Sequence, residues 1–265
     1  MKQETARMEA HTDTAANRRF VAQFAATPEE VMESLQLRFR VFAEELGARL
    51  ESADAGIDLD RYDEHCRHLV VRDTFSGRLV ASTRVLTGAG AREAGGFYSE
   101  NEFDLGFLAA LPGRMMEVGR TCVDPAFRNG AVISTLWSLL AGCVVSGRVD
   151  YLFGCASIGL SDGGAQAHAV LDYLGHNYLS PPAQRVRAYN PLPASDCRAH
   201  TTTPRLPPLL KAYVSLGARA CGEPYWDRDF DCADVFMLLN VADLAPRYAR
   251  RFMRPVAVDA LSHAA

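Results

Sequence analysis

Uninterrupted apolar runs are short in this sequence, although 48% of its 265 residues are hydrophobic. None approaches the roughly 18 to 20 residues that a membrane-spanning helix requires. Residues 1–19 mix Lys, Glu, Thr, Ala and Asn and lack the apolar core of a secretory signal peptide. We therefore expect a flexible tail at 1–19 and a cytoplasmic protein, whose contact with the inner face of a membrane is at most peripheral.

A basic excess and paired cysteine motifs are also absent. The 28 Lys and Arg residues are outnumbered by 32 Asp and Glu residues, which leaves a net charge of −4. A general nucleic-acid-binding protein normally has the opposite balance, so we expect no nucleic-acid partner. The seven cysteines show no CxxC spacing, which is typical of reduced cytosolic thiols rather than of a disulfide framework or a zinc site. We predict no bound metal.

Hydrophobic periodicity predicts a single α/β domain over residues 20–255, without internal repeats, followed by a C-terminal tail at 256–265. A chain of 265 residues could also form two small domains, but one sizeable core is the simpler arrangement. The capping hydroxyl of Thr27, followed by Pro28 and two acids, predicts a helix start, and Gly47 predicts its end. The other predicted elements are strands at 20–25, 68–71, 79–86, 115–123, 151–156 and 234–240, and helices from near 132 and over 166–174, 209–216 and 243–252.

The most informative segment is Glu117-Val118-Gly119-Arg120, which interrupts the otherwise apolar strand predicted at 115–123. Charge inside a buried strand is costly unless it is paired or used, so this pair marks a candidate active site. Side chains alternate along a strand, so Glu117 and Arg120 face opposite sides unless a bulge or a strand end lies between them. We predict such an irregularity. Partial burial would raise the pKa of Glu117 towards the range of a general base, and Arg120 would oppose that rise.

Five further charged residues lie in or beside apolar elements upstream, namely Arg38, Asp58, Asp60, Asp63 and Arg84. Two interpretations remain open for them. Arg38, Asp63 and Arg84 form, with Glu117 and Arg120, a structural ion-pair network that ties the first helix to the sheet, or residues of this set bind a substrate. Both functions are compatible with one another.

The order of these residues resembles the pattern of acyl-homoserine-lactone synthases, which are GNAT-like acyltransferases. The pattern is Arg38 and Phe42, then Asp60 and Asp63, then Arg84, and finally Glu117 with Arg120. Four longer segments, at 95–105, 151–157, 206–213 and 229–235, resemble the related L-ornithine N-alpha-acyltransferases, which begin ornithine-lipid synthesis. This resemblance runs from about Phe20 to Phe252. It implies a GNAT-like fold, which is a mixed twisted sheet flanked by helices.

The family implies an N-acyltransferase that moves a 3-hydroxy fatty acyl group from acyl carrier protein to the α-amine of L-ornithine, giving lyso-ornithine lipid. No permanently bound cofactor is implied, because the donor is the acyl-phosphopantetheine of the carrier protein. The family also implies a splayed strand, where the backbone N–H of Cys122 or Val123 polarises the thioester carbonyl, and direct attack without an acyl-enzyme. Glu117 is the predicted base, acting directly or through water.

Recognition of ornithine calls for at least one arginine for its carboxylate and one acid for its second amine. Arg38 and Arg84 are candidates for the first, and Asp60 and Asp63 for the second. Phe42 is the remaining substrate-binding residue that the family pattern suggests.

The donor phosphate is predicted to bind at the N-terminus of the helix that begins near Val132, where unpaired N–H groups favour anions. The preceding residues Arg128, Asn129, Gly130 and Ala131 contain no second glycine, which weakens coenzyme A binding and fits a carrier protein. Because acyl carrier protein is acidic, we selected docking candidates by charge: Arg128, Arg148, Arg185, Arg187 and Lys211. The acyl chain is expected in a cleft lined from Trp137, Phe153 and Leu174. Arginines at 247–254 could contact anionic lipid, but a solvated helix face is the favoured interpretation.

Several alternatives remain. An acyl-homoserine-lactone synthase would use S-adenosylmethionine as the amine, and the segments from Leu206 to Asp234 argue against it. An N-acyl amino acid synthase with another acceptor is a second alternative. A non-catalytic acyl-carrier-protein-binding module is disfavoured by the retention of both Glu117 and Arg120. A nucleophilic Cys122 is disfavoured because no histidine is near it in sequence and buried cysteines are usually small core residues.

Overall fold

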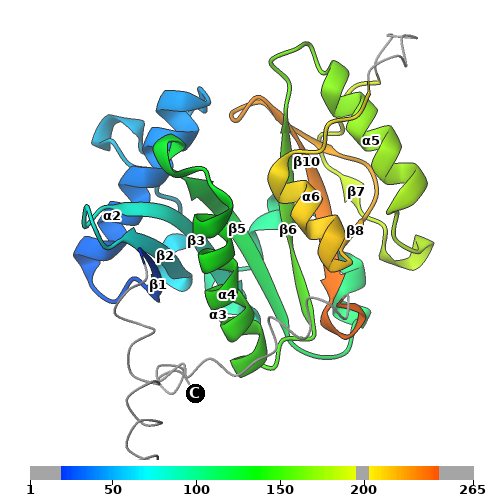
Figure 1. Ribbon diagram of the computed structural model, residues 1–265. Helices are drawn as coiled ribbons and strands as arrows, with labels where there is room; N and C mark the ends of the chain where they lie inside the picture. Colours follow the sequence, from blue (N-terminus) through cyan, green and yellow to red (C-terminus); the bar gives the residue numbers. More distant parts are fainter. Residues whose placement is uncertain (1–18, 195–202, 245–265) are drawn as a thin grey trace, which may run out of the picture.

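A computed structural model describes residues 19–194 and 203–244, and its centre is a mixed sheet of eight strands (Figure 1). The order is β1-β2-β3-β5-β6-β10-β8, with β9 also paired to β10. Only the β5 and β6 pair is parallel. The strands are β1 (Phe20–Phe24), β2 (Arg67–Asp73), β3 (Leu79–Thr87), β5 (Met115–Val123), β6 (Tyr151–Gly159), β8 (Arg219–Ala220), β9 (Tyr225–Asp227) and β10 (Cys232–Asn240). Two short strands, β4 (Phe103–Asp104) and β7 (Arg187–Ala188), pair separately.

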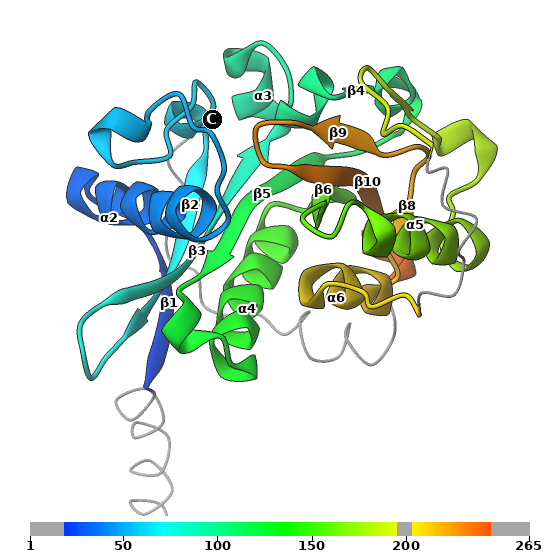
Figure 2. The same cartoon turned by 90° about the horizontal axis from the view of Figure 1, so that it is seen from above.

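Helices cover both faces of the sheet, as Figure 2 shows. They are α2 (Pro28–Phe39), α3 (Gly88–Ala94), α4 (Gly130–Ser146), α5 (Ala165–Asn177) and α6 (Pro208–Leu216). Leu69 and Val71 of β2 pack in the cluster that contains α4, whereas Val70 packs with Leu37 of α2. Alternating residues of β2 are thus buried on opposite faces, which explains its continuous apolar run. The expected mixed sheet flanked by helices is confirmed.

The ends of the chain and one internal segment lie outside the described residues. Most of the tail predicted at 1–19, the tail at 256–265 and nearly all of the helix predicted at 243–252 fall there, together with the arginines at 247–254. Arg19 is described, and its side chain donates to Asp73 at 2.9 Å. Within residues 19–194 and 203–244, none of the helices combines the length and the apolar character that crossing a bilayer demands.

Helix α2 begins as predicted, since the Thr27 hydroxyl accepts from the N–H of Glu30 at 3.3 Å and Pro28 is the first helical residue. After Phe39 the helix continues as a wider, π-helical segment over Arg40–Glu45. This segment is followed by Gly47, whose φ of 78° lies in the left-handed region. The sequence pattern did not indicate this wider segment. π-Helical segments are frequent at functional sites.

Strand β5 contains the irregularity predicted between Glu117 and Arg120. Arg84 pairs with Gly119, but Ser82 pairs with Cys122, so β5 contains one more residue than β3 over this interval. Arg120 takes the left-handed conformation, with a φ of 51°. The bulge therefore turns Arg120 to the same side as Glu117, and both side chains line one cavity.

Strands β5 and β6 separate after Glu117, just before the bulge. Their pairing covers only 115–117 of β5 and 151–153 of β6, although both strands continue past it. Figure 1 shows the two ribbons diverging from this point. At the point of separation a Cβ on Gly154 would lie 2.2 Å from the carbonyl oxygen of Val118, so only glycine permits this approach. The splayed strand that the family resemblance implied is confirmed.

Candidate active site

Two hollows meet where β5 and β6 separate. The first, which we call the polar cavity, has a volume of about 240 Å³, and its lining includes Arg84, Tyr98, Glu102, Glu117, Arg120 and Asp234. The second, the apolar groove, has a volume of about 620 Å³ and runs between α4 and α6. Phe42, Leu46, Thr121 and Leu209 line both hollows. Two ligands bound from these two sides would therefore meet at β5.

Three arginines and three aspartates form a network of ion pairs beside the polar cavity, namely Arg38, Arg84 and Arg120 with Asp58, Asp60 and Asp63. Arg38 has no exposed surface and donates to Asp58 at 2.7 Å and to Asp63 at 2.6 Å. Arg84 donates to both oxygens of Asp60, at 2.6 and 2.7 Å. Burial acts to raise the pKa of Asp63, but the guanidiniums of Arg84 and Arg38 outweigh it and hold that pKa far below its ordinary value.

The structural interpretation is thus confirmed for Arg38, Asp63, Arg84 and Arg120, because their network joins α2 to β3 and β5, whereas Glu117 lies outside it. Arg38, Asp60 and Asp63 are not among the residues that line the two hollows. Their side chains are engaged in the ion-pair network, so a direct contact with the substrate stays a prediction for these three residues. Arg84 does line the polar cavity, although its side chain is only 4% exposed.

Glu117 is held by the chain segment that precedes β4. Its carboxylate accepts from the N–H of Tyr98 at 2.7 Å, from the N–H of Ser99 at 2.8 Å and from the Ser99 hydroxyl. Burial raises the pKa of Glu117, and the hydrogen bonds from Ser99 oppose that rise. The carboxylate is thus fixed in the cavity wall with a pKa shifted in the direction predicted for a base.

Arg120 was expected to oppose the rise in the pKa of Glu117, but the guanidinium that does so is that of Arg84. Among the described residues, the ion pairs of Arg120 are with Asp58 at 3.2 Å and with Asp60 at 3.5 Å. Its guanidinium also lies 4.8 Å from the ring centre of Tyr98 and 4.9 Å from that of Phe230. These contacts fix the guanidinium between two aromatic walls of the cavity.

Three carboxylates of the polar cavity were missed by the sequence analysis, namely Glu102, Asp227 and Asp234. Glu102 accepts from the Cys155 thiol at 3.1 Å, and Asp234 accepts from the Ser157 hydroxyl at 2.6 Å. Burial raises the pKa of Glu102 well above its ordinary value and that of Asp234 to about 6, and the neighbouring carboxylates add to both shifts. Asp234 interrupts an apolar strand, which is the signal that revealed Glu117.

A tyrosine of α6 was also missed as a site residue. Tyr213 lines the polar cavity, and its ring packs edge-on against Trp137, a residue of the apolar groove, with 5.4 Å between ring centres. Burial raises the pKa of Tyr213 above its ordinary value, while a hydrogen bond with Thr121 opposes the rise. The hydroxyl therefore stays protonated near the junction of the two hollows.

The two backbone N–H groups proposed at the end of β5 differ in direction. The N–H of Asp124 donates to the carbonyl oxygen of Val80 at 2.8 Å, so Asp124 forms a hydrogen-bonded pair with β3. In an antiparallel ladder such pairs alternate with pairs whose N–H groups point away. The N–H of Val123 therefore points away from β3 towards the separation from β6, whereas that of Cys122 points towards β3.

Cys122 itself is a buried core thiol. It packs with Leu37 and Val70, and burial raises its pKa to about 12. A thiol in this state is a poor nucleophile. The structure thus agrees with the sequence argument against a cysteine mechanism.

We expect the Cys122→Ala variant to retain its turnover number, because the thiol takes no part in the reaction. Loss of a true nucleophile costs about 10⁶-fold in a well-studied serine protease, so the two cases are easily separated. The measurement is kcat, together with intact-protein mass spectrometry during turnover. An acyl adduct on Cys122 would contradict the expectation.

The N-terminus of α4 borders the apolar groove, where Arg128, Asn129 and Gly130 contribute to its lining. The helix begins at Gly130, and the Asn129 side chain accepts from the N–H groups of Ala131 and Val132, both at 3.1 Å. Two of the N–H groups predicted to be free for a phosphate are thus occupied by this cap. Arg128 is engaged as well, since it forms two 2.6 Å bonds with Glu45.

The five basic residues selected as docking candidates do not share one surface. Arg128 precedes α4 and Arg148 follows it, so the length of a 17-residue helix, about 25 Å, separates them. Arg187 lies on β7, and Lys211 is exposed on α6 beside the groove residue Ala212.

One of the three residues predicted to line the acyl cleft borders the apolar groove. Trp137 lines the apolar groove. Phe153 and Leu174 instead belong to two hydrophobic core clusters and are not part of the groove lining.

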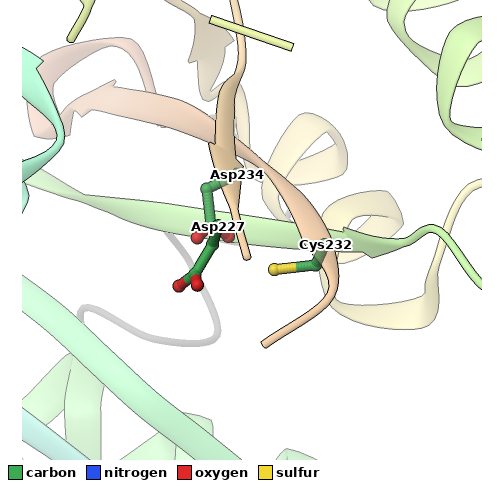
Figure 3. Close-up of side chains that lie close together, drawn as sticks. All are labelled: Asp227, Cys232 and Asp234. Carbon is green, nitrogen blue, oxygen red and sulfur yellow. The ribbon is translucent and has the colours of Figure 1, made fainter. Parts of the chain in front are cut away.

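A possible metal-ligand group lies at one end of the polar cavity. Asp227, Cys232 and Asp234 offer atoms that all lie within 4.8 Å of one another, and Figure 3 shows their side chains gathered there. Burial raises the pKa of the Cys232 thiol far above its ordinary value, so without a metal ion the thiol is protonated. One oxygen of Asp234 is already bonded to Ser157. The absence of a metal therefore stays our prediction.

The separated parallel strands, the bulged β5 and the groove beside the α4 N-terminus define a GNAT-type acyltransferase. The model of the acetyltransferase (GNAT) domain matches residues 37–138. The chain is 33% identical to L-ornithine N(alpha)-acyltransferase of Rhodobacter capsulatus, over 91% of this chain and 98% of that protein. It is 34% identical to L-ornithine N(alpha)-acyltransferase of Agrobacterium fabrum, over 85% of this chain and 82% of that protein. The chain belongs to the L-ornithine N(alpha)-acyltransferase family, as the sequence resemblance indicated.

Solved structures show more distant similarity. An N-acyl amino acid synthase from uncultured soil microbes superposes with a TM-score of 0.49 at 14% identity, covering 85% of this chain and 92% of that one. The acyl-homoserine-lactone synthase LasI superposes with a TM-score of 0.45 at 11% identity, covering 84% of this chain and 90% of that one.

Proposed function

We propose that the protein transfers a 3-hydroxy fatty acyl group from acyl carrier protein to the α-amine of L-ornithine, which gives lyso-ornithine lipid. The observation that carries this proposal is the β5 bulge, because it turns Glu117 and Arg120 into the polar cavity at its junction with the apolar groove. The relatives named above supply the acceptor by analogy.

The chemistry assigns each group one role. The neutral α-amine attacks the thioester carbon, and Glu117 takes the amine proton directly or through water. The carbonyl oxygen becomes an oxyanion, which the N–H of Val123 stabilises. Collapse of this intermediate breaks the carbon–sulfur bond and expels the pantetheine thiolate, to which the Tyr213 hydroxyl donates a hydrogen bond. The proton that Glu117 took from the amine then passes to the thiolate through water, which restores the carboxylate. No acyl-enzyme forms.

The polar cavity suits a small zwitterionic acceptor. Its volume of about 240 Å³ lies just below the ~300–1,000 Å³ that is usual for drug-sized ligands. The guanidiniums of Arg84 and Arg120 form one charged part of the lining and would attract the α-carboxylate of an amino acid. Phe42, which lines both hollows, would separate the acceptor from the acyl chain.

The apolar groove suits the donor. Val41, Ile133, Trp137 and Leu216 contribute to its lining, and its volume of about 620 Å³ is sufficient for an acyl-pantetheine segment. The Asn129 cap must turn aside before a donor phosphate can use the N–H groups of α4. This competition supports a carrier protein, whose affinity comes from surface contacts, over free coenzyme A.

We expect Lys211→Glu to lower kcat/KM for acyl carrier protein by roughly three- to tenfold, because a charge at the rim of an interface mainly affects association. The matched control is Arg187→Glu, which changes an exposed cation on β7, away from the groove. Steady-state rates with acyl carrier protein and with acyl-pantetheine provide the measurement. An equal loss with both donors would show that Lys211 acts on catalysis and not on docking.

The proposed function is tested by mass spectrometry of the products formed from 3-hydroxyacyl carrier protein and an equimolar mixture of amino acids with S-adenosylmethionine. N-acyl-ornithine as the predominant product supports the proposal. Acyl-homoserine lactone, or an amide of another amino acid, would keep the acyltransferase and replace the acceptor. No product with a competent donor would favour a carrier-binding module instead.

A further inference from the structure

The charges of the polar cavity do not balance within the described residues. The three arginines of the network are matched by three aspartates, and Glu117 is compensated by two backbone N–H groups and a hydroxyl. Glu102 and Asp234 are left over, together with the half-buried Asp227, whose carboxylate accepts the N–H groups of Asp229 and Phe230. None of them forms an ion pair with a cation among residues 19–194 and 203–244. Carboxylates buried without a cation are costly, so this end of the cavity lacks a positive charge.

The arrangement of these carboxylates points to a ligand that enters the cavity. Glu102 is 3% exposed, lines the cavity and has only the Cys155 thiol as a side-chain hydrogen-bond partner in the described part of the chain. Asp234 is 4% exposed on β10, and Asp227 lies at the end of the neighbouring β9. Figure 3 shows the carboxylates of Asp227 and Asp234 close together. Two segments that are far apart in sequence, the one before β4 and the β9–β10 hairpin, thus present acids to one hollow.

Glu102 is also linked to the candidate base. It follows directly on the turn Tyr98–Asn101, whose N–H groups hold Glu117. Ser99 contacts both Glu117 and Cys155, and Cys155 contacts Glu102. The base and the leftover acids therefore belong to one connected wall of the cavity.

We propose that Glu102 and Asp234, assisted by Asp227, bind the side-chain ammonium of the acceptor and select a diamino acid over amino acids with neutral side chains. This inference rests on the proposed function, since it assigns the second amine of ornithine while the first is at Glu117. It replaces the sequence-based assignment of that role to Asp60 and Asp63, whose carboxylates are engaged by arginines.

An ammonium suits this group better than a metal ion. The Ser157 hydroxyl already donates to one oxygen of Asp234, which leaves fewer carboxylate oxygens for a metal ion. Three carboxylates also offer enough acceptors for the three N–H donors of an ammonium.

The test compares ornithine with norvaline, which has the same carbon chain without the side-chain amine. The Asp234→Asn and Glu102→Gln variants should raise KM for ornithine at least about tenfold, as expected for loss of a hydrogen bond to a charged group. KM for norvaline should stay unchanged. The control is Asp229→Asn, which alters an exposed acid in the turn between β9 and β10. The wild type should use norvaline at least tenfold less efficiently, which is a test that needs no variant to fold.

The outcomes separate this inference from the proposed function. If the wild type forms no N-acyl-ornithine, the proposed function fails. If it forms N-acyl-ornithine but each variant raises both KM values equally, or the wild type uses both acceptors equally well, the function stands and the inference is overturned. Stoichiometric metal in the purified protein, lost in Asp234→Asn, would also overturn it and assign the group to a cation.

Discussion

Replacing Glu117 with glutamine is expected to lower kcat by about 10²- to 10⁴-fold, which is the range for loss of a general base. Glutamine has nearly the same shape as glutamate, and its one oxygen can still accept from the N–H of Ser99, although its amide nitrogen cannot accept from the N–H of Tyr98. It cannot take the amine proton. The loss should therefore appear in kcat with a small change in KM for ornithine, measured by the rate of thiol release from acyl carrier protein.

The matched control is Glu100→Gln, because Glu100 is an exposed residue of the same turn that holds Glu117. It should behave as the wild type. Unchanged turnover in Glu117→Gln, with a folded protein, would remove Glu117 from the mechanism and leave proton removal to solvent or to another cavity carboxylate.

The Arg38→Leu variant is expected to lose about 3–5 kcal/mol of unfolding free energy, the usual cost of removing one partner from a buried ion pair. Arg38 is fully buried and bonds two aspartates from the loop before β2. Without it, Asp58 and Asp63 become buried charges with reduced compensation. Urea unfolding at neutral pH measures this loss, and Arg40→Leu, an exposed neighbour, should stay within about 0.5 kcal/mol of the wild type.

The same variant has a defined pH dependence. Because the network lowers the pKa of Asp63 below its ordinary value of 3.8, its stabilising contribution is present above pH 3.8 and is lost as the pH falls further. The difference in unfolding free energy between wild type and Arg38→Leu should therefore shrink in acid. A difference below about 1 kcal/mol at neutral pH would contradict the structural role that we assign to the network.

The bulge in β5 was predictable because a strand alternates its side chains, and two charges three residues apart cannot share one face of a regular strand. The bounds of β5 and the start of α2 were also predictable, because an apolar run marks the strand and a capping residue followed by proline marks the helix start. Helix α3 was missed because two glycines in seven residues lower its helical propensity. Thr87 nevertheless caps it by accepting from the N–H of Gly90.

The partners of the charged residues could not be derived from local pattern. Arg120 was expected to influence Glu117, but the hydrogen-bond donors to Glu117 come from a turn almost 20 residues earlier. Glu102 and Asp234 share the cavity because β10 pairs with β6. This pairing places a segment late in the sequence beside a strand that borders the cavity. Asp234 was detectable as a charge within an apolar strand. Glu102 was not, because it lies in a polar stretch that is typical of an exposed loop.

In the proposed active site, the cavity presents the α-amine of ornithine to the thioester and keeps the side-chain ammonium of ornithine away from the thioester. Tandem mass spectrometry of the product of one turnover with 3-hydroxyacyl carrier protein tests this most directly, because it locates the acyl group on one nitrogen. We expect acylation of the α-nitrogen alone. Acylation of the side-chain nitrogen, or of both nitrogens, would contradict it.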